Sequence, residues 1–244
     1  MTPLAGRRRI ETEASYELVA SEYYDSGRHP TCANFREASR ILLREWRLPL
    51  VSSRRVCEIG AGKSITAEIF SEENRPLDGL TLVDESPSML AYSKHWTQEG
   101  ANLKLGAASH LPFATEEVDV VVSCLGDPYN GVSFWREVSR ILRHEGLCLF
   151  TTPSHDWATS FRKQTNSDPE SAQFELLDGT RVLLPSFILH DSDQVALIQS
   201  CELEVCKVAH ISVRDLSGHR LSPKLLLSRG QDASVVAGYL ISKP

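Results

Sequence analysis

The sequence predicts an α/β fold built on a mostly parallel sheet, and three observations support this prediction. Short apolar runs alternate with segments of helical periodicity along most of the chain. Two glycines, at positions 60 and 62, follow an apolar run and precede a helix-compatible segment, which is the order of a buried strand, a tight turn and a helix start. Residues 118–123 are largely apolar, as in a central parallel strand that is buried on both faces.

Composition limits the classes of protein that the chain can represent. A chain of 244 residues is one domain, with at most a modest insertion, and an apolar fraction of 41% supplies a core. No apolar run approaches the roughly 20 residues of a membrane span. The arginines near the N-terminus are not followed by an apolar segment, so we expect no signal peptide. The net charge of −6 argues against a protein that binds duplex nucleic acid.

The cysteines indicate a reduced setting. Six are present without any Cys-x-x-Cys pair, and the histidines show no metal-ligand spacing with them. Cys57, Cys124 and Cys148 lie in or beside apolar runs and are expected to be small buried side chains. We therefore expect a cytoplasmic protein without a metal site.

The N-terminal region is predicted to be helical. Residues 1–10 are expected to be disordered, and residues 11–26 are helix-compatible up to the break at Gly27 and Pro30. Residues 31–46 have apolar side chains near 3.6 spacing, which predicts a second helix. On this helix Arg36, Arg40 and Arg44 recur every four residues. They form either a solvated helical face or a docking surface for an acidic partner or substrate.

The glycine turn spans residues 56–65, and three patterns compete for it. A phosphate-binding P-loop would need a glycine where Cys57 stands, and a dinucleotide fingerprint would need one in place of Ile65. The third pattern is an acid two residues before the first glycine, Glu58-x-Gly60-x-Gly62. The alternative to these three patterns is that the segment forms only a strand, a turn and a helix and binds no ligand.

A second acid supports a ligand site. Residues 80–84 form a β-branched and aliphatic run that ends in Asp84, which lies 22 residues after Gly62. An acid about 20 residues beyond such a turn, at the end of the next parallel strand, is placed to bind a ribose diol. The alternative is that Asp84 is only the N-cap of the helix that follows.

These anchors together resemble the first motifs of the class I S-adenosylmethionine-dependent methyltransferases. The third glycine of the family is Ser64 here, and residues 85–90 resemble the second motif. Residues 106–113 resemble the third, in which Ala107 replaces the acid that usually holds the adenine amino group. An Arg-Ile-Leu-Arg-x-x-Gly segment between a helix (133–143) and a strand (146–152) completes a resemblance that covers about residues 55–153.

The resemblance implies a Rossmann-like fold and a cofactor. The fold is a seven-stranded, mostly parallel sheet with an antiparallel last strand, N-terminal helices and a small hairpin insertion after the fifth strand. The implied cofactor is S-adenosyl-L-methionine. Its expected contacts are Tyr24, Glu58, Gly60, Ala61, Gly62, Asp84, Glu85, Met89, Ala107, Ala108, Ser109, Ser123, Cys124 and Leu125.

The loop after the fourth strand is expected to meet the transferring methyl group, because ligands bind at the carboxyl ends of strands in such sheets. It carries Asp127 and Tyr129, and its Asp-Pro-Tyr faintly resembles the Asn/Asp-Pro-Pro-Tyr loop of methylases that act on adenine amino groups. A simple turn is the alternative. His155 follows the fifth strand. We take Asp127 and His155 as candidate general bases, with Tyr24, Tyr129 or His29 positioning the substrate.

The remaining elements complete the predicted domain organisation. Apolar residues on either side of Asp178-Gly179 predict a hairpin over 174–185, after a polar loop over 164–172. A helix over 192–200 and strands over 203–213 and 235–241 follow. We expect an N-terminal helical cap over 1–50 and a methyltransferase domain over 51–244, in which 164–190 is a substrate-covering insertion.

The predicted function is methyl transfer to an oxygen or nitrogen atom of a small molecule, including one with an anionic group. The absence of a basic groove and the presence of the hairpin favour this over nucleic acid, and we expect no membrane contact. Two alternatives stay open: an RNA or protein methyltransferase that uses the Arg36, Arg40 and Arg44 face, and a non-catalytic, cofactor-binding partner subunit, which Ser64 and Ala107 make conceivable.

Overall fold

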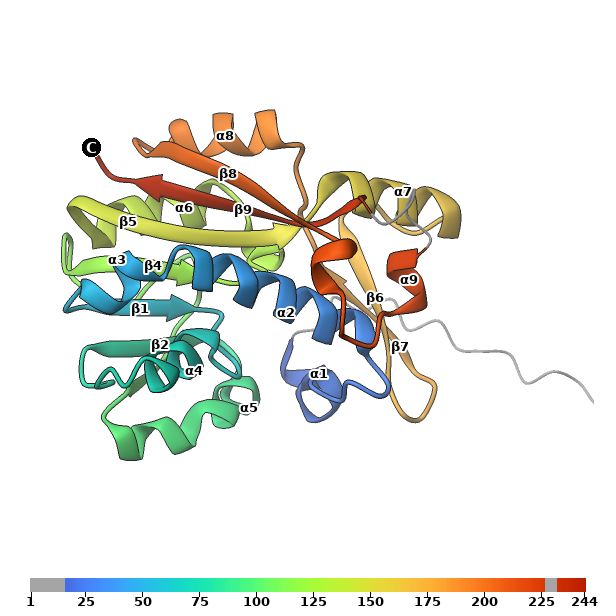
Figure 1. Cartoon of the computed structure of the whole chain (residues 1–244), viewed down its shortest axis with the longest axis horizontal. Coiled ribbons are helices and arrows are strands. Elements are labelled where there is room, and N and C mark those ends of the chain that lie inside the picture. The colour runs from blue at the N-terminus through green and yellow to red at the C-terminus, as the bar shows by residue number, and fades with distance from the viewer. Residues whose placement is uncertain (1–15, 227–231) are drawn as a thin grey trace, which may run out of the picture.

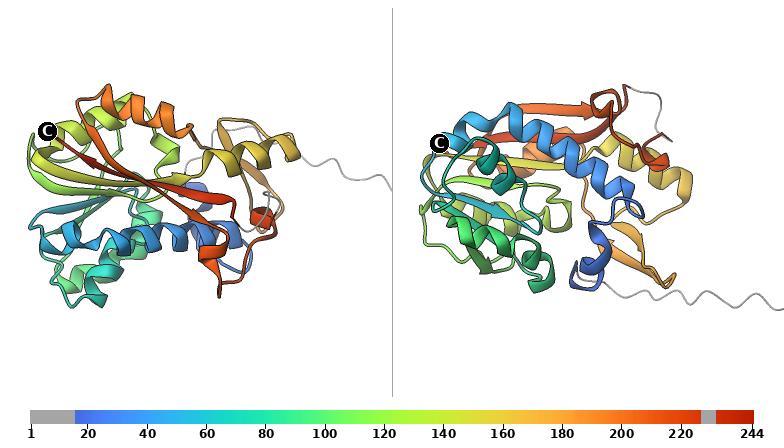
Figure 2. Two further views of the ribbon diagram at one scale, coloured as in Figure 1. Left: turned by 45° about the horizontal axis from the view of Figure 1, so that its top comes forward. Right: turned by 60° about the horizontal axis from the view of Figure 1, so that its bottom comes forward.

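The structure is a computed structural model that describes residues 16–226 and 232–244. The expected disorder of residues 1–10 and the first part of the expected N-terminal helix lie outside these residues. Figure 1 shows a twisted central sheet with helices on both sides of it, and Figure 2 shows the same layers from two further directions. No helix in the described part of the chain is long and apolar enough to cross a membrane.

The sheet has seven strands in the order β3-β2-β1-β4-β5-β9-β8, and a separate hairpin pairs β6 with β7. Strand β9 runs antiparallel to both of its neighbours, and the pairings among β1 to β5 are parallel. The predicted seven-stranded sheet with an antiparallel last strand is therefore confirmed. The strands are β1 (Val56–Ile59), β2 (Leu80–Asp84), β3 (Asn102–Leu105), β4 (Val118–Ser123), β5 (Leu142–Pro153), β6 (Ser171–Glu175), β7 (Arg181–Pro185), β8 (Glu204–Ser212) and β9 (Ser234–Ser242).

Helices cover the sheet and extend beyond its edge. The α-helices are α1 (Tyr16–Tyr23), α2 (Pro30–Glu45), α3 (Arg47–Ser52), α4 (Ile65–Glu72), α5 (Pro87–Leu90), α6 (Val132–Ile141), α7 (His155–Thr165), α8 (Asp191–Gln199) and α9 (Pro223–Leu226). The 3-10 helices are η1 (Ala91–Glu99), η2 (Asp127–Tyr129) and η3 (Arg214–Leu216).

Two hydrophobic cores lie on opposite faces of the sheet, because successive strand residues point to opposite sides. Val120 and Val122 of β4 join the core that contains α2 and α4, whereas Val121 joins the core beneath α6. Every residue of β1 and β4 is buried. The apolar run over 118–123 is thus the central, doubly covered strand that its composition predicts.

The expected elements after β4 are present with shifted bounds. Strand β5 begins at Leu142, several residues before the expected position 146, and the polar segment from 164 still belongs partly to α7. His155 follows β5, as expected, and is the first residue of α7. The hairpin over 174–185 is confirmed, and its turn contains Gly179 with a positive φ of 82°.

A cap lies beyond the carboxyl ends of the parallel strands. It consists of α1, the β6–β7 hairpin and the segment with η3 and α9, which gather at one end of the sheet in Figures 1 and 2. Val19 of α1 packs with Phe174, Val182 and Leu184 of the hairpin in a small cluster of its own. The segment 220–222 is joined to α2, since Asn34 donates to the Arg220 carbonyl (3.1 Å) and accepts from the Ser222 amide (2.8 Å).

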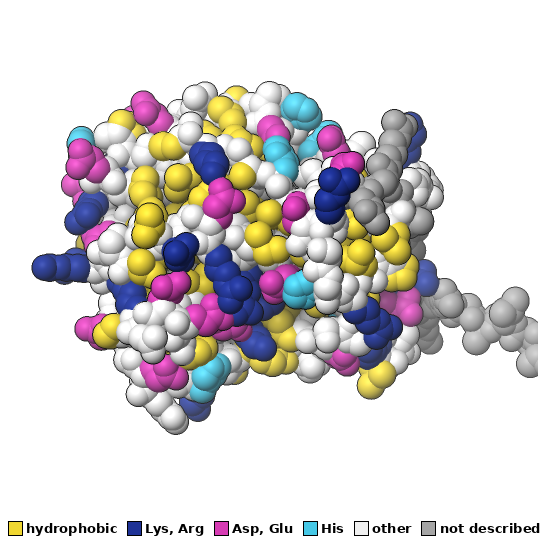
Figure 3. Space-filling view, in the orientation of Figure 1, with side chains coloured by type: hydrophobic (Ala, Val, Ile, Leu, Met, Phe, Trp, Pro, Cys, Tyr) yellow, Lys and Arg dark blue, Asp and Glu magenta, His cyan; other side chains and the backbone are white. Residues whose placement is uncertain are grey.

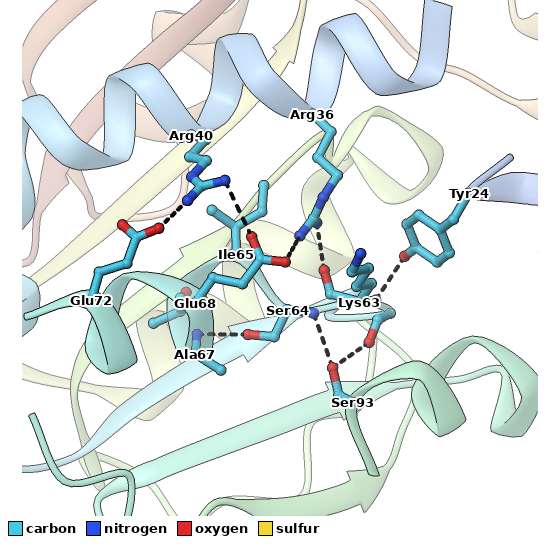
Figure 4. Close-up of polar contacts among 12 residues, drawn as sticks. Tyr24, Arg36, Arg40, Lys63, Ser64, Ile65, Ala67, Glu68, Glu72 and Ser93 are labelled. Atoms are coloured by element: carbon cyan, nitrogen blue, oxygen red, sulfur yellow. Dashed lines mark hydrogen bonds and ion pairs between the residues drawn. The ribbon is translucent and has the colours of Figure 1, made fainter. Parts of the chain in front are cut away.

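The arginine row on α2 packs against an acidic row on α4. Arg36 donates to Glu68 at 2.7 Å, and Arg44 donates to Glu72 at 2.7 Å. Arg40 also bonds Glu72, and Figure 4 shows Arg36 and Arg40 meeting Glu68 and Glu72 between the two helices. Cations and anions consequently alternate on this face of the molecule (Figure 3). Of the two alternatives for this row, the docking surface has less support, because Glu68 and Glu72 of α4 already pair with the arginines.

We expect the triple variant R36Q/R40Q/R44Q to lose stability. Each surface ion pair contributes roughly 0.2–1 kcal/mol, so the free energy of unfolding should fall by about 1–2 kcal/mol and the loss should shrink at high salt. Urea unfolding at low and high ionic strength measures both effects. Arg181→Gln, which breaks the exposed Arg181–Glu175 pair of the hairpin, is the matched control and should change little. Unchanged stability in the triple variant would contradict a fastening role.

Candidate active site

The glycine turn is shaped by two tyrosine hydroxyls. Gly60 and Gly62 have positive φ values of 65° and 40°, a conformation that other residues rarely adopt. A Cβ at Gly60 would lie 2.5 Å from the Tyr129 hydroxyl oxygen, and one at Gly62 would overlap the Tyr24 hydroxyl. The Tyr24 hydroxyl accepts a hydrogen bond from the Lys63 amide at 2.7 Å. Both glycines are therefore required by the turn and by its neighbours.

Glu58, the acid before the glycines, binds the start of α4. Its carboxylate accepts bonds from the Ser64 hydroxyl and, at 3.2 Å each, from the amides of Ile65 and Thr66. Burial raises the pKa of this carboxyl, and the hydrogen bond from Ser64 opposes that rise. Ser64 also caps α4 by accepting from the Ala67 amide at 2.9 Å. The serine that stands where the family has its third glycine thus has a structural role.

Asp84, the second acid, holds the glycine turn to the next loop. One oxygen accepts from the Gly62 amide and the other from the Ser86 amide, both at 2.9 Å. Burial raises the pKa of Asp84. The residue is not the N-cap of α5, because Ser86 holds that position and accepts from the Met89 amide. Asp84 instead lies at the end of β2 and lines a cavity.

The cavity has a volume of about 950 Å³ and runs from the glycine turn to the cap. Cavities of about 300–1,000 Å³ hold drug-sized ligands, so this one is at the upper end of that range. Most of the predicted cofactor contacts line it: Tyr24, Glu58, Gly60, Ala61, Asp84, Glu85, Met89, Ala107, Ala108, Ser109, Cys124 and Leu125. Gly62 and Ser123 are outside the lining, and the Ser123 hydroxyl instead lies 2.9 Å from that of Tyr129.

These residues fit a nucleoside cofactor. Gly60 and Ala61 of the glycine turn line the cavity together with Asp84, so both turn backbone and a carboxylate border it. Ala107 and Ser109 line the cavity beyond β3, where the family places adenine. No acid stands at position 107, so backbone groups and the Ser109 hydroxyl are the polar groups available there.

Asp127 does not line the cavity. The side chain is buried, and its carboxylate accepts from the Ser186 hydroxyl at 2.6 Å. Arg162 in turn donates to that same hydroxyl oxygen at 3.0 Å. The Asp127 carbonyl accepts from the Phe187 amide at 2.8 Å. Its contacts fasten the loop after β4 to the end of the hairpin, so the structure gives Asp127 a structural role and does not bring it to the cavity as the expected base.

His155 is also outside the cavity lining. Its ring lies 5.3 Å from that of His190, and its Nδ1 atom is 3.7 Å from the Asp156 carboxylate. Tyr129 does line the cavity, and its hydroxyl donates to the Ile59 carbonyl at 2.9 Å. Of the three predicted catalytic residues, only Tyr129 is thus brought to the cavity, where its hydroxyl supports the glycine turn.

Several cavity residues were not singled out by the sequence. The row of tyrosines in the N-terminal region was a signal for Tyr16 and Tyr23, both of which line the cavity. Cys32, Phe187 and Arg220 line it too, but they belong to no motif. Arg220 is far from every motif in sequence and reaches the cavity because its segment is bonded to Asn34 of α2.

Comparison with known proteins agrees with the geometry. Residues 57–150 match the model of a family described as "Methyltransferase domain". A search of curated proteins finds no match. A chain from the complex between the Haloferax volcanii Trm112 methyltransferase activator and a methyltransferase aligns with a TM-score of 0.66 at 14% identity, covering 96% of this chain and 100% of that one.

Two further solved structures share the fold. A Listeria monocytogenes protein described as an S-adenosylmethionine-dependent methyltransferase aligns with a TM-score of 0.64 at 14% identity, covering 85% of this chain and 99% of that one. Geranyl diphosphate C-methyltransferase from Streptomyces coelicolor A3(2), solved with S-adenosyl-L-homocysteine, aligns with a TM-score of 0.60 at 9% identity, covering 84% of this chain and 77% of that one.

Residues 57–150 therefore match a methyltransferase domain. The seven-stranded sheet has the fold shared by these S-adenosylmethionine-dependent methyltransferases.

We expect Asp84→Ala to weaken binding of S-adenosylhomocysteine by about 2–4 kcal/mol, because charge-assisted hydrogen bonds to the cofactor are lost. Isothermal titration calorimetry measures the change. Asp119→Asn is the control, since Asp119 bonds the amides of Arg54 and Arg55 ahead of β1. An unchanged dissociation constant in the Asp84 variant would mean that Asp84 serves only the two loops it joins.

We expect Asp127 to make stability depend on pH. Burial raises its pKa from 3.8 to about 6, so the folded protein retains a proton that the unfolded chain has lost between these values. The free energy of unfolding should therefore fall as pH rises through this interval, by up to about 3 kcal/mol. Asp127→Asn should remove that fall, which denaturant unfolding between about pH 4 and pH 7 measures. A variant with the pH dependence of the wild type would contradict the burial of an ionisable group here.

Proposed function

We propose that the protein transfers the methyl group of S-adenosylmethionine to an oxygen or nitrogen atom of a small molecule. The observation that carries this proposal is the cap over the cavity. Residues of α1, such as Tyr16, and residues after the hairpin, such as Phe187, line the same cavity as Asp84. A covered cavity suits an acceptor that can be enclosed, whereas a polymer needs an open groove.

The protein's part in the reaction is chiefly alignment. Bound S-adenosylmethionine supplies a methyl group on a positively charged sulfur, so the cofactor carries the reactive centre. The glycine turn and Asp84 would hold the nucleoside part of the cofactor at one end of the cavity. The cap holds the acceptor atom in line with the methyl carbon and excludes water, which replaces an encounter in solution by a bound geometry.

We assign the bounds of the domain and its insertion from their positions in the chain. We take residues 1–50 as the N-terminal helical cap, residues 51–244 as the methyltransferase domain, and residues 164–190 as the insertion that completes the cover. In the described part of the cap, Glu17 of α1 accepts from the Ser88 amide at 3.0 Å and so reaches α5, which begins shortly after Asp84. Such a contact would couple acceptor enclosure to the cofactor end of the cavity.

A nucleic-acid or protein substrate has less support. The arginines that could have bound a polymer are paired with Glu68 and Glu72, and the chain carries a net charge of −6. Arg220 lines the cavity and forms no ion pair within the described chain, so an anionic group on a small substrate has a partner there.

A partner subunit is a separate question. The Haloferax volcanii complex pairs a methyltransferase with an activator protein, and at 14% identity that likeness concerns the fold. Our proposal assigns catalysis to this chain, because its own residues enclose the cavity on both the cofactor side and the cap side.

We expect a cell extract incubated with the protein and methyl-labelled S-adenosylmethionine to become labelled in its low-molecular-weight fraction. Fractionation by size, with nuclease and protease treatment of the large fraction, measures where the label resides. Asp84→Ala is the control and should abolish labelling, because it weakens cofactor binding. Label that appears in RNA or protein instead would refute the small-molecule proposal.

A further inference from the structure

The part of the cavity beneath the cap has an aromatic, uncharged wall. Tyr16, Tyr23 and Phe187 contribute rings to the lining, and Cys32 contributes a thiol. Burial raises the pKa of Cys32 to about 11 and raises those of Tyr16 and Tyr23 above their ordinary values, so these groups are neutral at physiological pH. We call these four residues, together with His29, the acceptor chamber.

His29 is the basic side chain of this chamber. It lies just before α2, and its imidazole stacks on Phe174 of the hairpin with ring centroids 3.9 Å apart and planes inclined by 24°. The side chain is only 12% exposed, and its Nε2 atom is buried without a hydrogen-bond partner in the structure. Stacking from the hairpin fixes the plane of the ring.

The carboxylate of Glu22 of α1 lies beside the imidazole of His29. Its Oε2 atom is 3.8 Å from His29 Nε2 and accepts from Arg28 Nη1 at 2.7 Å. Its Oε1 atom accepts from the Leu177 amide of the hairpin turn at 3.0 Å. Two bonds therefore hold the carboxylate in place beside Nε2.

Burial has the largest effect on the pKa of His29 and lowers it. Arg28 lowers this pKa further, while Glu22 and Asp25 act in the opposite direction. A neutral imidazole is the form that can accept a proton, and a base with a carboxylate beside it is an arrangement that activates hydroxyl nucleophiles in enzymes.

We propose that the acceptor chamber binds an uncharged, hydroxyl-bearing aromatic group, and that His29, with Glu22 beside it, is the base that takes the hydroxyl proton. This inference rests on the proposed methyl transfer to a small molecule. An ammonium group is disfavoured in the chamber, because burial of a charge without a paired counter-ion is costly. The Glu22 carboxylate is already paired with Arg28, and Asp127 is outside the lining and bonded to Ser186.

The proposed step balances as follows. The acceptor oxygen forms a bond to the methyl carbon while the bond between sulfur and that carbon breaks, and the electron pair of the broken bond stays on sulfur. The hydroxyl proton passes to the imidazole of His29. The imidazolium that results is stabilised by the Glu22 carboxylate until the proton leaves to solvent.

The test uses fragments on the full protein saturated with S-adenosylhomocysteine. p-Cresol carries the proposed group, 4-methylanisole lacks the hydroxyl proton, and benzylamine is a cation of similar shape. We expect p-cresol to shift the imidazole NMR signals of His29 and to bind better than benzylamine. Its affinity should fall roughly threefold to tenfold as pH drops through the pKa of His29, because an imidazolium cannot accept its hydrogen bond. The affinity of 4-methylanisole should not follow that titration.

Three variants separate the roles. His29→Gln should abolish the pH dependence of p-cresol binding, and His144→Gln, at an exposed position, should retain it. Glu22→Gln should lower the pH at which affinity is lost, because it removes the group that raises the pKa of His29. The Glu22 variant also keeps the test valid should His29→Gln fail to fold.

The outcomes are distinguishable. Binding of S-adenosylhomocysteine without any p-cresol shift at His29, or tighter binding of benzylamine, overturns the inference and leaves the methyltransferase assignment intact. If the affinity for p-cresol still depends on pH in His29→Gln, His29 is not the base, and the other parts of the inference stand. A protein that fails to bind S-adenosylhomocysteine overturns the proposed function itself.

Discussion

The missing side chains of Gly60 and Gly62 are the constraint on which the site depends. The hydroxyl of Tyr129 occupies the space beside Gly60, and that of Tyr24 occupies the space beside Gly62. The first tyrosine follows β4 and the second belongs to the N-terminal region, so the turn is the point where the sheet and the cap meet. A methyl group at Gly60 would displace Tyr129, and one at Gly62 would displace Tyr24, so close packing at Gly62 couples the cofactor turn to the N-terminal region.

The charged side chains of α2 and α4 mainly hold these two helices together and do not form a basic surface. The arginines of α2 meet the acids of α4, and Arg36 also bonds the carbonyl of Lys63 at the end of the glycine turn. The ion pairs therefore hold α2 against the helix that begins at the cofactor site. Because the arginines are satisfied internally, the basic row visible in the sequence does not become a basic face in the fold.

The loop after β4 shows how a candidate catalytic segment can serve structure. Asn130 donates to the Gln194 side chain at 2.6 Å and to the Phe187 carbonyl at 3.0 Å, and it accepts from Trp135 at 2.9 Å. With Asp127 bonded to Ser186, the loop is fixed to the segment that closes the cap. The polar side chains of this loop therefore hold neighbouring segments in place. The proposed base is instead His29, which lies just before α2.

The sequence by itself determined the parts of the protein whose contacts are local or whose spacing is regular. Glu58, Gly60, Gly62 and Asp84 stand at strand ends, and the carboxyl ends of parallel strands meet at one edge, so their grouping followed from the pattern. The seven-stranded fold with its antiparallel last strand followed from the family that these motifs resemble.

Only the tertiary structure decided which polar side chains face the cavity. Asp127 and His155 follow strands as a base would, but one is turned to Ser186 and the other begins α7. His29 and Glu22 form their pair through the hairpin, about 150 residues away in sequence, where Phe174 and the Leu177 amide lie. Contacts between such distant segments leave no periodicity in a single sequence, because they depend on how the cap packs and not on the local conformation of the chain.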